Sequence, residues 1–309
     1  GRAVLRIGQG EMVVRLGIIT AGRSDWGHLE GLVAALSQVM DVVVIGSRGA
    51  GMDVGAEISY FALRYQSAAR LDAVLIFGDR WEQMAAAIAT ITKNLPVIHL
   101  HAGEWTPHAF DNQCRRVISS LAHLFLVAHG LHRTRLLGMG IPAHRIHVTG
   151  APGLDRFLLP AASREAVAEA LGLDLARDWA LVMLHPTTFR PEDAEQELAD
   201  ALVAVGHRQA IWLTPGNDPG GEWFRERMVN PIEAIPDDLY RSLIRHVDVV
   251  IGNSSAVVVD APFVGVKTVE IGLRQAGRNR VPYGDGYSIP RIVNILQGID
   301  FRPLLCEAS

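Results

Sequence analysis

The segment VIHLHAGEWTPHAFDNQCRRVISSLAH, residues 97–123, gathers titratable side chains in the connection between a predicted strand and a predicted helix. His99 and His101 alternate along the strand, which directs both side chains to one face. Glu104 and Asp111 follow in the connection. Imidazole and carboxyl groups in this arrangement suit proton transfer. A metal site is the alternative, because His-x-His with a nearby carboxylate provides common metal ligands.

Polar residues also follow other predicted strands. Asp79 in IFGDR and His185 in VMLHPTT each stand at the end of an apolar run. In IGNSS, Asn253 follows such a run, and Ser254 and Ser255 precede a predicted helix, whose free N–H groups and dipole attract phosphate. The alternatives are a plain serine N-cap and, for His185, a structural histidine.

Further charged residues suit the binding of a nucleotide. Asp260 lies nearly two turns beyond Ser254 on the predicted helix, where its carboxylate can accept hydrogen bonds from ribose hydroxyls. Arg23 follows the first predicted strand, and Arg274 and Arg278 follow VEIG. Each arginine can bind a pyrophosphate or form a surface ion pair instead. TAGRSDWGHL lacks the G-x-G-x-x-G spacing and no G-x-x-x-x-G-K-[ST] occurs, which argues against nicotinamide and P-loop nucleotide sites.

The elements that must position these residues are short Val/Ile/Leu runs that alternate with longer amphipathic segments. The runs VVRLGIIT, DVVVIGS, LDAVLIFGD and PVIHLH are followed later by WALVMLHP, AIWLTPGN, DVVIGNSS and KTVEIG. This alternation predicts an α/β protein with two Rossmann-like, doubly wound parallel sheets. A Pro-bearing connection near residue 158 predicts domains at 12–157 and 158–309, the last helix packing back on the first domain. Ligands bind beyond the carboxyl ends of such strands, so one cleft shared by both sheets is expected.

Composition narrows the class of protein. The 309 residues are 49% hydrophobic and 20% charged, with a formal net charge of −4, which is typical of a globular protein and argues against nucleic-acid and membrane-surface binding. The most apolar stretch is interrupted by two aspartates and an asparagine, so no membrane span is expected. Only Cys114 and Cys306 are present, which suits a reducing compartment, the cytoplasm. The first residues lack the pattern of a secretory signal, and Met12 is a plausible native start.

Taken together, these segments resemble the UDP-N-acetylglucosamine 2-epimerase family, and within it the hydrolysing branch that includes the epimerase domain of the bifunctional sialic-acid enzyme. The similarity runs through GRSDWGHLEGL, IFGDR, HLHAGE, DNQCRRVISSLAH, HPTTF, IGNSS, GLRQAGR and YGDGYSIPRIVNILQGID. The resemblance implies a GT-B-like fold with a nucleotide-sugar substrate between the two domains, no cofactor, no metal and a homodimer. It makes the first domain the sugar and acid/base side, to which the second domain adds His185, and the second domain the nucleotide-binding side.

The resemblance also implies roles for particular residues. The acid/base set is Asp79, His101, Asp111 and His185. The substrate-binding set is Arg23, Glu104, Asn253, Ser254, Ser255, Asp260, Arg274 and Arg278. The chain departs from the family at position 101, which is His in place of Glu. The stretches before LDAVLIFGD and before YGDGYSIPR are shorter than in the family. The sequence ends soon after QGIDFRPLL, where relatives continue with another helix.

The family's reaction removes the C2 proton of the sugar while the nucleoside diphosphate leaves C1, and water then adds to the glycal with the opposite configuration at C2. IGSRGAG stands where the non-hydrolysing branch has a TGQH-like segment, so the expected reaction releases UDP and N-acetylmannosamine from UDP-N-acetylglucosamine. Three alternatives stay open. They are a nucleotide-sugar or nucleotide hydrolase that does not epimerise, a catalytically silent nucleotide-sugar binder, and an unrelated hydrolase with a metal at His-x-His.

Overall fold

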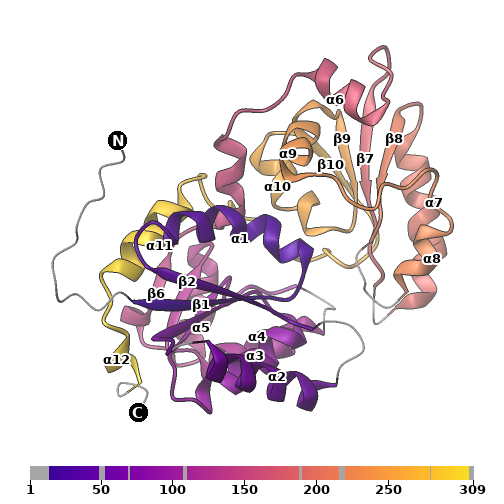
Figure 1. The fold of residues 1–309 in the computed structure, drawn as a ribbon. Coiled ribbons are helices and arrows are strands. Elements are labelled where there is room, and N and C mark those ends of the chain that lie inside the picture. The colour runs from indigo at the N-terminus through magenta and orange to yellow at the C-terminus, as the bar shows by residue number, and fades with distance from the viewer. Residues whose placement is uncertain are drawn as a thin grey trace, which may run out of the picture.

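The computed structural model of the chain describes residues 14–48, 53–68, 70–106, 110–187, 190–215, 220–278 and 280–305. Met12 and Cys306 lie outside these residues, and so does the side chain of Arg23. The described residues form two α/β units, each built on its own parallel sheet (Figure 1). The predicted fold class, two Rossmann-like sheets in a GT-B-like arrangement, is confirmed.

The first sheet has six strands in the order β2-β1-β3-β4-β5-β6, all paired in parallel. Its strands are β1 (Arg15–Thr20), β2 (Asp41–Gly46), β3 (Ala73–Phe77), β4 (Val97–Leu100), β5 (Leu124–Val127) and β6 (Ile146–Val148). The helices between them are α1 (Arg23–Leu36), α2 (Val54–Ser67), α3 (Trp81–Ile91), α4 (Asp111–Leu121), α5 (Gly130–Gly138) and the 3-10 helix η1 (Ala143–Arg145).

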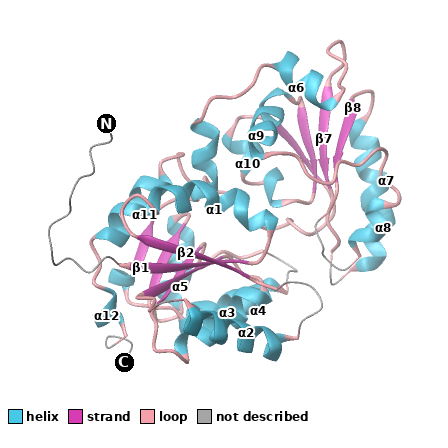
Figure 2. Ribbon diagram, viewed as in Figure 1, coloured by secondary structure: helices cyan, strands magenta, loops and turns pink. Residues whose placement is uncertain are grey.

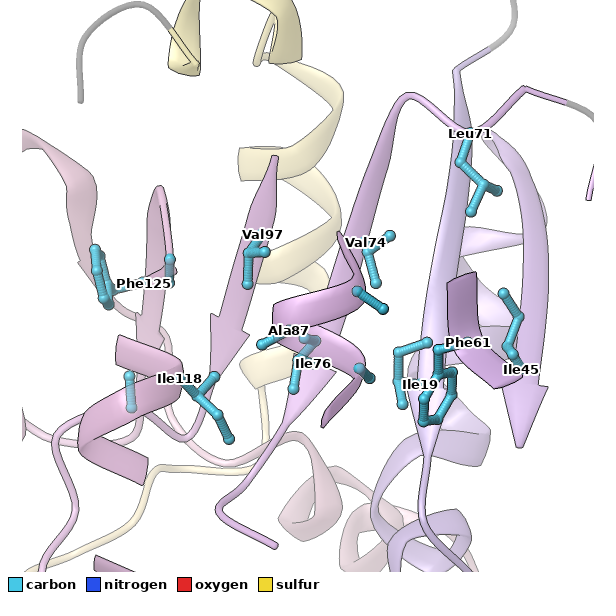
Figure 3. Packing of buried hydrophobic residues seen from close by; sticks show 14 of the residues in the cluster. Ile19, Ile45, Phe61, Leu71, Val74, Ile76, Ala87, Val97, Ile118 and Phe125 are labelled. Carbon is cyan, nitrogen blue, oxygen red and sulfur yellow. The ribbon is translucent and has the colours of Figure 1, made fainter. Parts of the chain in front are cut away.

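Helices cover both faces of this sheet, which explains why its central strands are apolar throughout (Figure 2). On β3, Val74 and Ile76 pack in one core with Phe61 of α2 and Ile118 of α4 (Figure 3). Leu75, between them, packs in the opposite core. This two-sided burial holds the carboxyl ends of neighbouring strands at one rigid edge.

The second sheet has four parallel strands in the order β10-β9-β7-β8. Its strands are β7 (Trp179–Met183), β8 (Gln209–Leu213), β9 (Val249–Gly252) and β10 (Lys267–Glu270). Its helices are α6 (Arg164–Leu171), η3 (Pro191–Asp193), α7 (Ala194–Val205), α8 (Gly221–Arg225), α9 (Asp237–His246), η4 (Ser255–Val257) and α10 (Asp260–Phe263). Buried Trp179 of β7 packs in the core formed with α6 and α9.

The end of the described chain returns to the first sheet. The 3-10 helix η2 (Pro152–Leu158) leads out of the first unit, α11 (Ser288–Gln297) packs beside α1 (Figure 1), and α12 (Phe301–Leu304) contributes Phe301 to the same core. The carboxylate of Asp155 in η2 accepts hydrogen bonds from the first two N–H groups of α11, at 2.9 and 2.7 Å. The domain limits at 12–157 and 158–309 stay a prediction. Within the described ranges, no helix combines the length and the apolar character needed to span a membrane.

Candidate active site

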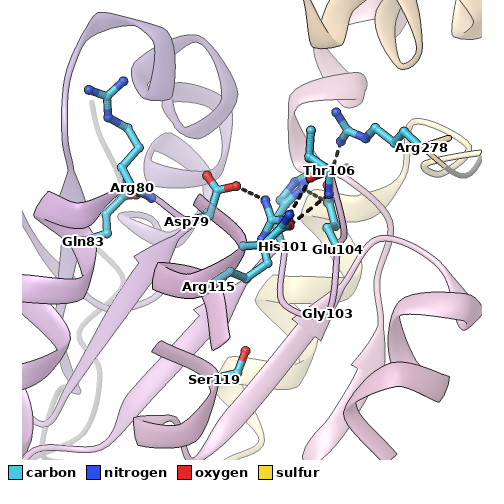
Figure 4. A network of polar contacts seen from close by, with 12 residues as sticks. Asp79, Arg80, Gln83, His101, Gly103, Glu104, Thr106, Arg115, Ser119 and Arg278 are labelled. Carbon is cyan, nitrogen blue, oxygen red and sulfur yellow. Dashed lines mark hydrogen bonds and ion pairs between the residues drawn. The ribbon is translucent and has the colours of Figure 1, made fainter. Parts of the chain in front are cut away.

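Polar side chains meet at the carboxyl ends of β3 and β4. Asp79 follows β3 and His101 follows β4 (Figure 4), and Asp111 is the first residue of α4. Glu104 lies in the loop after His101 and is bonded to it. The structure therefore brings these four predicted residues to one edge of the first sheet, as expected for parallel strands whose ends share an edge.

His101 has an unusual backbone conformation. Its φ of 62° lies in the left-handed region, which residues other than glycine seldom adopt. Its Nδ1 lies 2.5 Å from Oε1 of Glu104, and the edge of its ring faces Phe77, with centroids 5.0 Å apart. Its Nε2 is buried and has no hydrogen-bond partner among the described residues. One ring nitrogen is therefore fixed by Glu104, and the other is a buried nitrogen without a partner among the described residues.

Glu104 has hydrogen-bond partners in both domains. Its Oε2 accepts a hydrogen bond from Nη2 of Arg278, which follows β10, at 2.8 Å. Burial alone raises the pKa of Glu104, but His101, Arg278 and Arg115 outweigh burial and hold this pKa well below its usual range. Glu104 is therefore a buried carboxylate with a partner in each domain.

Arg115 of α4 is a member of the cluster that the sequence analysis did not select. Its Nη2 forms an ion pair with Oδ2 of Asp79 (Figure 4). Its Nε and Nη1 are buried and lack hydrogen-bond partners within the described part of the chain. The signal that could have found it is its spacing of one helical turn from Asp111, which puts both residues on one face of α4.

Two aspartates near this edge have raised pKa values. The pKa of Asp111 is raised to about 6, first by burial and then by the charge of Asp79, against the charges of nearby arginines. Burial also raises the pKa of Asp25 to about 6, although its carboxylate accepts bonds from the Ala21 N–H and from Nε2 of Gln83. Asp25 was not selected from the sequence either. A carboxyl group that titrates near pH 6 can both accept and donate a proton close to neutrality.

His99 does not join His101, contrary to the alternation expected along the strand. The strand ends at Leu100, and the left-handed backbone of His101 breaks the two-residue period. His99 is fully buried, with Nδ1 3.0 Å from Oγ of Ser119 and Nε2 2.8 Å from the Gly78 carbonyl oxygen, so both ring nitrogens have partners. Among the described residues, no group of three or more His, Cys, Asp or Glu side chains is placed to hold a metal ion.

On the second sheet, Asn253 ties two strand ends together. Its Oδ1 accepts a bond from the His185 N–H at 2.7 Å, and its Nδ2 donates to the His185 carbonyl and to Glu197, at 2.8 and 3.2 Å. The backbones of β7 and β9 approach so closely that a Cβ on Gly252 would meet the Met183 carbonyl oxygen at 2.0 Å. Asn253 therefore positions the backbone of His185 at the end of β7.

The helix predicted after Ser254 is wrong in extent. Ser254 caps the three-residue η4, accepting a bond from the Ala256 N–H at 3.3 Å, and Ser255 is exposed. A separate short helix, α10, begins at Asp260. Val258 and Val259, with φ of −108° and −119°, separate the two short helices, so Asp260 does not lie two turns along one helix from Ser254.

Other predicted residues of the second domain fall in two places. Nη1 of Arg274 lies 3.5 Å from the Asn253 carbonyl oxygen, and its charge lowers the pKa of Asp111 across the two domains. Asp260 instead lies with Arg156 and Tyr240, both 2.9 Å from its Oδ2. The structure thus gathers Arg274 and Arg278 toward the cluster of the first sheet and leaves the Asp260 carboxylate in an ion pair of its own.

Comparison with known proteins agrees with the family resemblance seen in the sequence. The family model described as UDP-N-acetylglucosamine 2-epimerase matches residues 46–282. The UDP-N,N'-diacetylbacillosamine 2-epimerase (hydrolyzing) of Legionella pneumophila is 33% identical over 239 residues, which are 74% of this chain and 63% of that protein. A UDP-N-acetylglucosamine 2-epimerase of Neisseria meningitidis is 32% identical over 220 residues, 67% of this chain and 57% of that protein. The matched part of the chain thus spans about three fifths of these curated relatives.

Solved structures share the fold. UDP-GlcNAc 2-epimerase from Neisseria meningitidis, solved bound to UDP-GlcNAc, has a TM-score of 0.76 at 14% identity and covers 92% of this chain and 99% of its own. The enzyme from Methanocaldococcus jannaschii, in complex with UDP-GlcNAc and UDP, has a TM-score of 0.75 at 17% identity, with the same coverage. At these identities the likeness concerns the fold.

Proposed function

Because the chain belongs to the UDP-N-acetylglucosamine 2-epimerase family, we propose that it is a hydrolysing nucleotide-sugar 2-epimerase that converts UDP-N-acetylglucosamine to UDP and N-acetylmannosamine. The observation that carries this proposal is the cluster of Asp79, His101 and Asp111 around Arg115, at the edge of the first sheet that arginines of the second domain approach. The names of the Legionella and Neisseria relatives support the same class of reaction. A homodimer in the cytoplasm remains part of the proposal.

The reaction needs a base, an acid and a stabilised leaving group. The base takes the proton from C2, the C2–H electron pair forms the C1=C2 double bond, and the C1–O bond breaks with its pair on the UDP oxygen. Water then adds its hydroxyl to C1, and an acid returns a proton to the opposite face of C2. His101 and Asp111 divide this proton transfer, since the pKa of Asp111 near 6 suits both roles. Asp79 forms an ion pair with Arg115, and its negative charge raises the pKa of the neighbouring Asp111.

The leaving diphosphate is assigned to the second domain. Ser254, Ser255 and Arg274 lie around the end of β9, and Asn253 fixes His185 beside them. The proposed contact of Asp260 with the ribose is retained. The proposed contact of Arg23 with the diphosphate rests on the sequence alone. Hydroxyl, imidazole and guanidinium groups together can hold a diphosphate whose negative charge grows as the C1–O bond breaks.

Incubation with UDP-N-acetylglucosamine in D₂O, followed by NMR of the products, tests the reaction. The expected result is UDP together with N-acetylmannosamine that carries deuterium at C2, because the proton added after elimination comes from solvent. Free N-acetylglucosamine without deuterium would instead favour the non-epimerising hydrolase, a second candidate suggested by His101 in place of the family's Glu. Binding of UDP without any turnover would favour the silent binder. Substrate kept in D₂O without protein is the control.

Replacing Ser254 and Ser255 together with Ala is expected to weaken UDP binding about tenfold or more, because charge-assisted hydrogen bonds are each worth about 1.5–3 kcal/mol. Titration calorimetry with UDP measures this. N-acetylmannosamine binding should change little, since the sugar is assigned to the first domain. The double change Ser119→Ala and Ser120→Ala, on α4 of the first sheet, is a control for loss of hydroxyl groups. Unchanged UDP affinity in the Ser254/Ser255 variant would contradict the assignment.

A further inference from the structure

A chain of polar contacts runs from His101 into the second domain. Glu104 accepts from Arg278 at 2.8 Å with one carboxylate oxygen and lies 2.5 Å from Nδ1 of His101 with the other. Arg278 is itself fixed, with Nε 2.9 Å from the Tyr283 hydroxyl and Nη1 3.1 Å from Oε1 of Gln275 (Figure 4 shows Arg278 reaching the loop of His101). All of these side chains are buried or partly buried. The imidazole of one domain is therefore connected to a rigid arginine of the other.

This chain of contacts dictates where the proton of a neutral His101 ring must lie. A guanidinium can only donate hydrogen bonds, so Arg278 requires an acceptor, and an ionised Glu104 offers only acceptors to both neighbours. The low pKa of Glu104 agrees with an ionised group. Nδ1 of His101 must then carry the hydrogen, which leaves the lone pair on Nε2, the buried nitrogen that has no partner among the described residues.

We infer that Glu104 and Arg278 are positioning residues for proton transfer: Arg278 fixes Glu104 from the second domain, and Glu104 holds His101 as the Nδ1–H tautomer, with Nε2 free to take the C2 proton. The inference rests on the proposed function and deepens it. It also changes the role expected for Glu104 and Arg278, which the sequence analysis assigned to substrate contacts. Since Arg278 belongs to the second domain, the base is complete only when the two domains meet.

The contact with Glu104 also stabilises His101 after its ring has taken the C2 proton. A carboxylate base becomes neutral when it takes a proton, whereas His101 becomes a cation, and the adjacent carboxylate of Glu104 offsets this charge. The groups whose charges interact with this ring are Glu104 in its own loop, His99 of β4, His28 of α1 and His132 of α5, while Arg115 of α4 and Arg278 of the second domain act on Glu104. Burial lowers the pKa of the three histidines, and Glu104 is the carboxylate among these groups that hydrogen-bonds directly to the ring.

The change Glu104→Gln tests the inference sharply, because an amide has one acceptor and one donor end. Arg278 should keep the amide oxygen on its own side, which turns the NH₂ group toward Nδ1 and forces the proton of His101 onto Nε2. The expected results are a switch to the Nε2–H tautomer and a fall in kcat of about 10²-fold, with KM nearly unchanged. Long-range ¹⁵N–¹H NMR of histidine-labelled protein reads the tautomer without substrate.

A second variant distinguishes positioning from a general loss of structure. With Arg278→Met added to Glu104→Gln, the amide is free to turn its oxygen toward Nδ1, so the Nδ1–H tautomer should return in part. Glu57→Gln, a buried carboxylate of α2 that accepts from the Arg48 N–H, is the matched control and should change neither tautomer nor kcat. Circular dichroism checks that each variant is folded.

The outcomes separate this inference from the proposed function. An Nε2–H tautomer in the wild-type protein, or a Glu104→Gln variant with unchanged tautomer and kcat, would overturn the inference even if epimerisation occurs. The Nδ1–H tautomer in a protein that does not act on UDP-N-acetylglucosamine would refute the proposed function and leave the positioning by Glu104 and Arg278 in place.

Discussion

Replacing His101 by Asn is expected to lower kcat about 10²–10⁴-fold, the usual contribution of a positioned acid or base, while UDP affinity stays within about twofold. Asn is a better replacement than Ala here, because Asn tolerates the left-handed φ of 62° that this position requires. The nucleotide is assigned to the second domain, around Ser254, so its affinity should not depend on the imidazole. Steady-state kinetics and calorimetry with UDP measure the two effects.

His207→Ala is the control, since this histidine is exposed on the second domain. His101→Ala should behave as His101→Asn does. If either variant keeps the wild-type rate and products, His101 has no catalytic role and is a structural residue that ends a strand.

The change His101→Glu asks whether the family's residue restores the family's chemistry. A carboxyl group at position 101 would lie beside the ionised Glu104, whose like charge raises its pKa, so the variant should keep C2 exchange while its pH profile changes. The NMR experiment in D₂O measures both. A wild-type protein that cleaves the substrate without deuterium at C2, together with exchange that appears only in His101→Glu, would show that the wild-type protein is a non-epimerising hydrolase.

The second large effect concerns stability. Removal of the Arg156 guanidinium by Arg156→Ala is expected to cost about 3–5 kcal/mol, because it leaves a buried carboxylate without its charge partner. Arg156 lies in η2, and its Nη2 is 2.9 Å from Oδ2 of Asp260, while its Nη1 is 2.7 Å from Oδ1 of Asp237 and 3.2 Å from the Gly27 carbonyl oxygen. Arg156, in the segment that connects the two sheets, therefore bonds to elements of both domains. Urea denaturation followed by circular dichroism measures the loss.

Two further variants isolate the cause of this loss. Arg190→Ala removes an arginine from an exposed ion pair with Asp193 and should cost at most about 1 kcal/mol. Adding Asp260→Asn to Arg156→Ala removes the stranded charge and should recover part of the stability. A double variant no more stable than Arg156→Ala would mean that the loss comes from packing against the Phe157 and Tyr240 rings, which lie 4.8 and 5.0 Å from the guanidinium.

The sequence by itself determined the architecture and the edge of the sheet that carries chemistry. Strands buried on both faces must be apolar throughout, as at Leu75 and Ile76, so the runs between amphipathic helices predicted two doubly wound sheets. Parallel strands end at a shared edge, so the polar residues that follow them, such as Asp79 and His101, could be predicted to meet. Both predictions depend on the spacing of apolar residues along the chain and on the direction of the strands, and both can be read from a sequence.

Only the tertiary structure decided which side chains become partners. Glu104 was expected to touch the substrate, yet it lies between His101 and Arg278, which is 174 positions away. Likewise, Asp260 is bonded to Arg156 across 104 positions, and Arg115 was overlooked on a helix whose inward face is set by packing against the sheet. A hydrogen bond depends on the distance and angle between two atoms. Those are fixed by how two domains approach each other, and no local pattern of residue types encodes that approach.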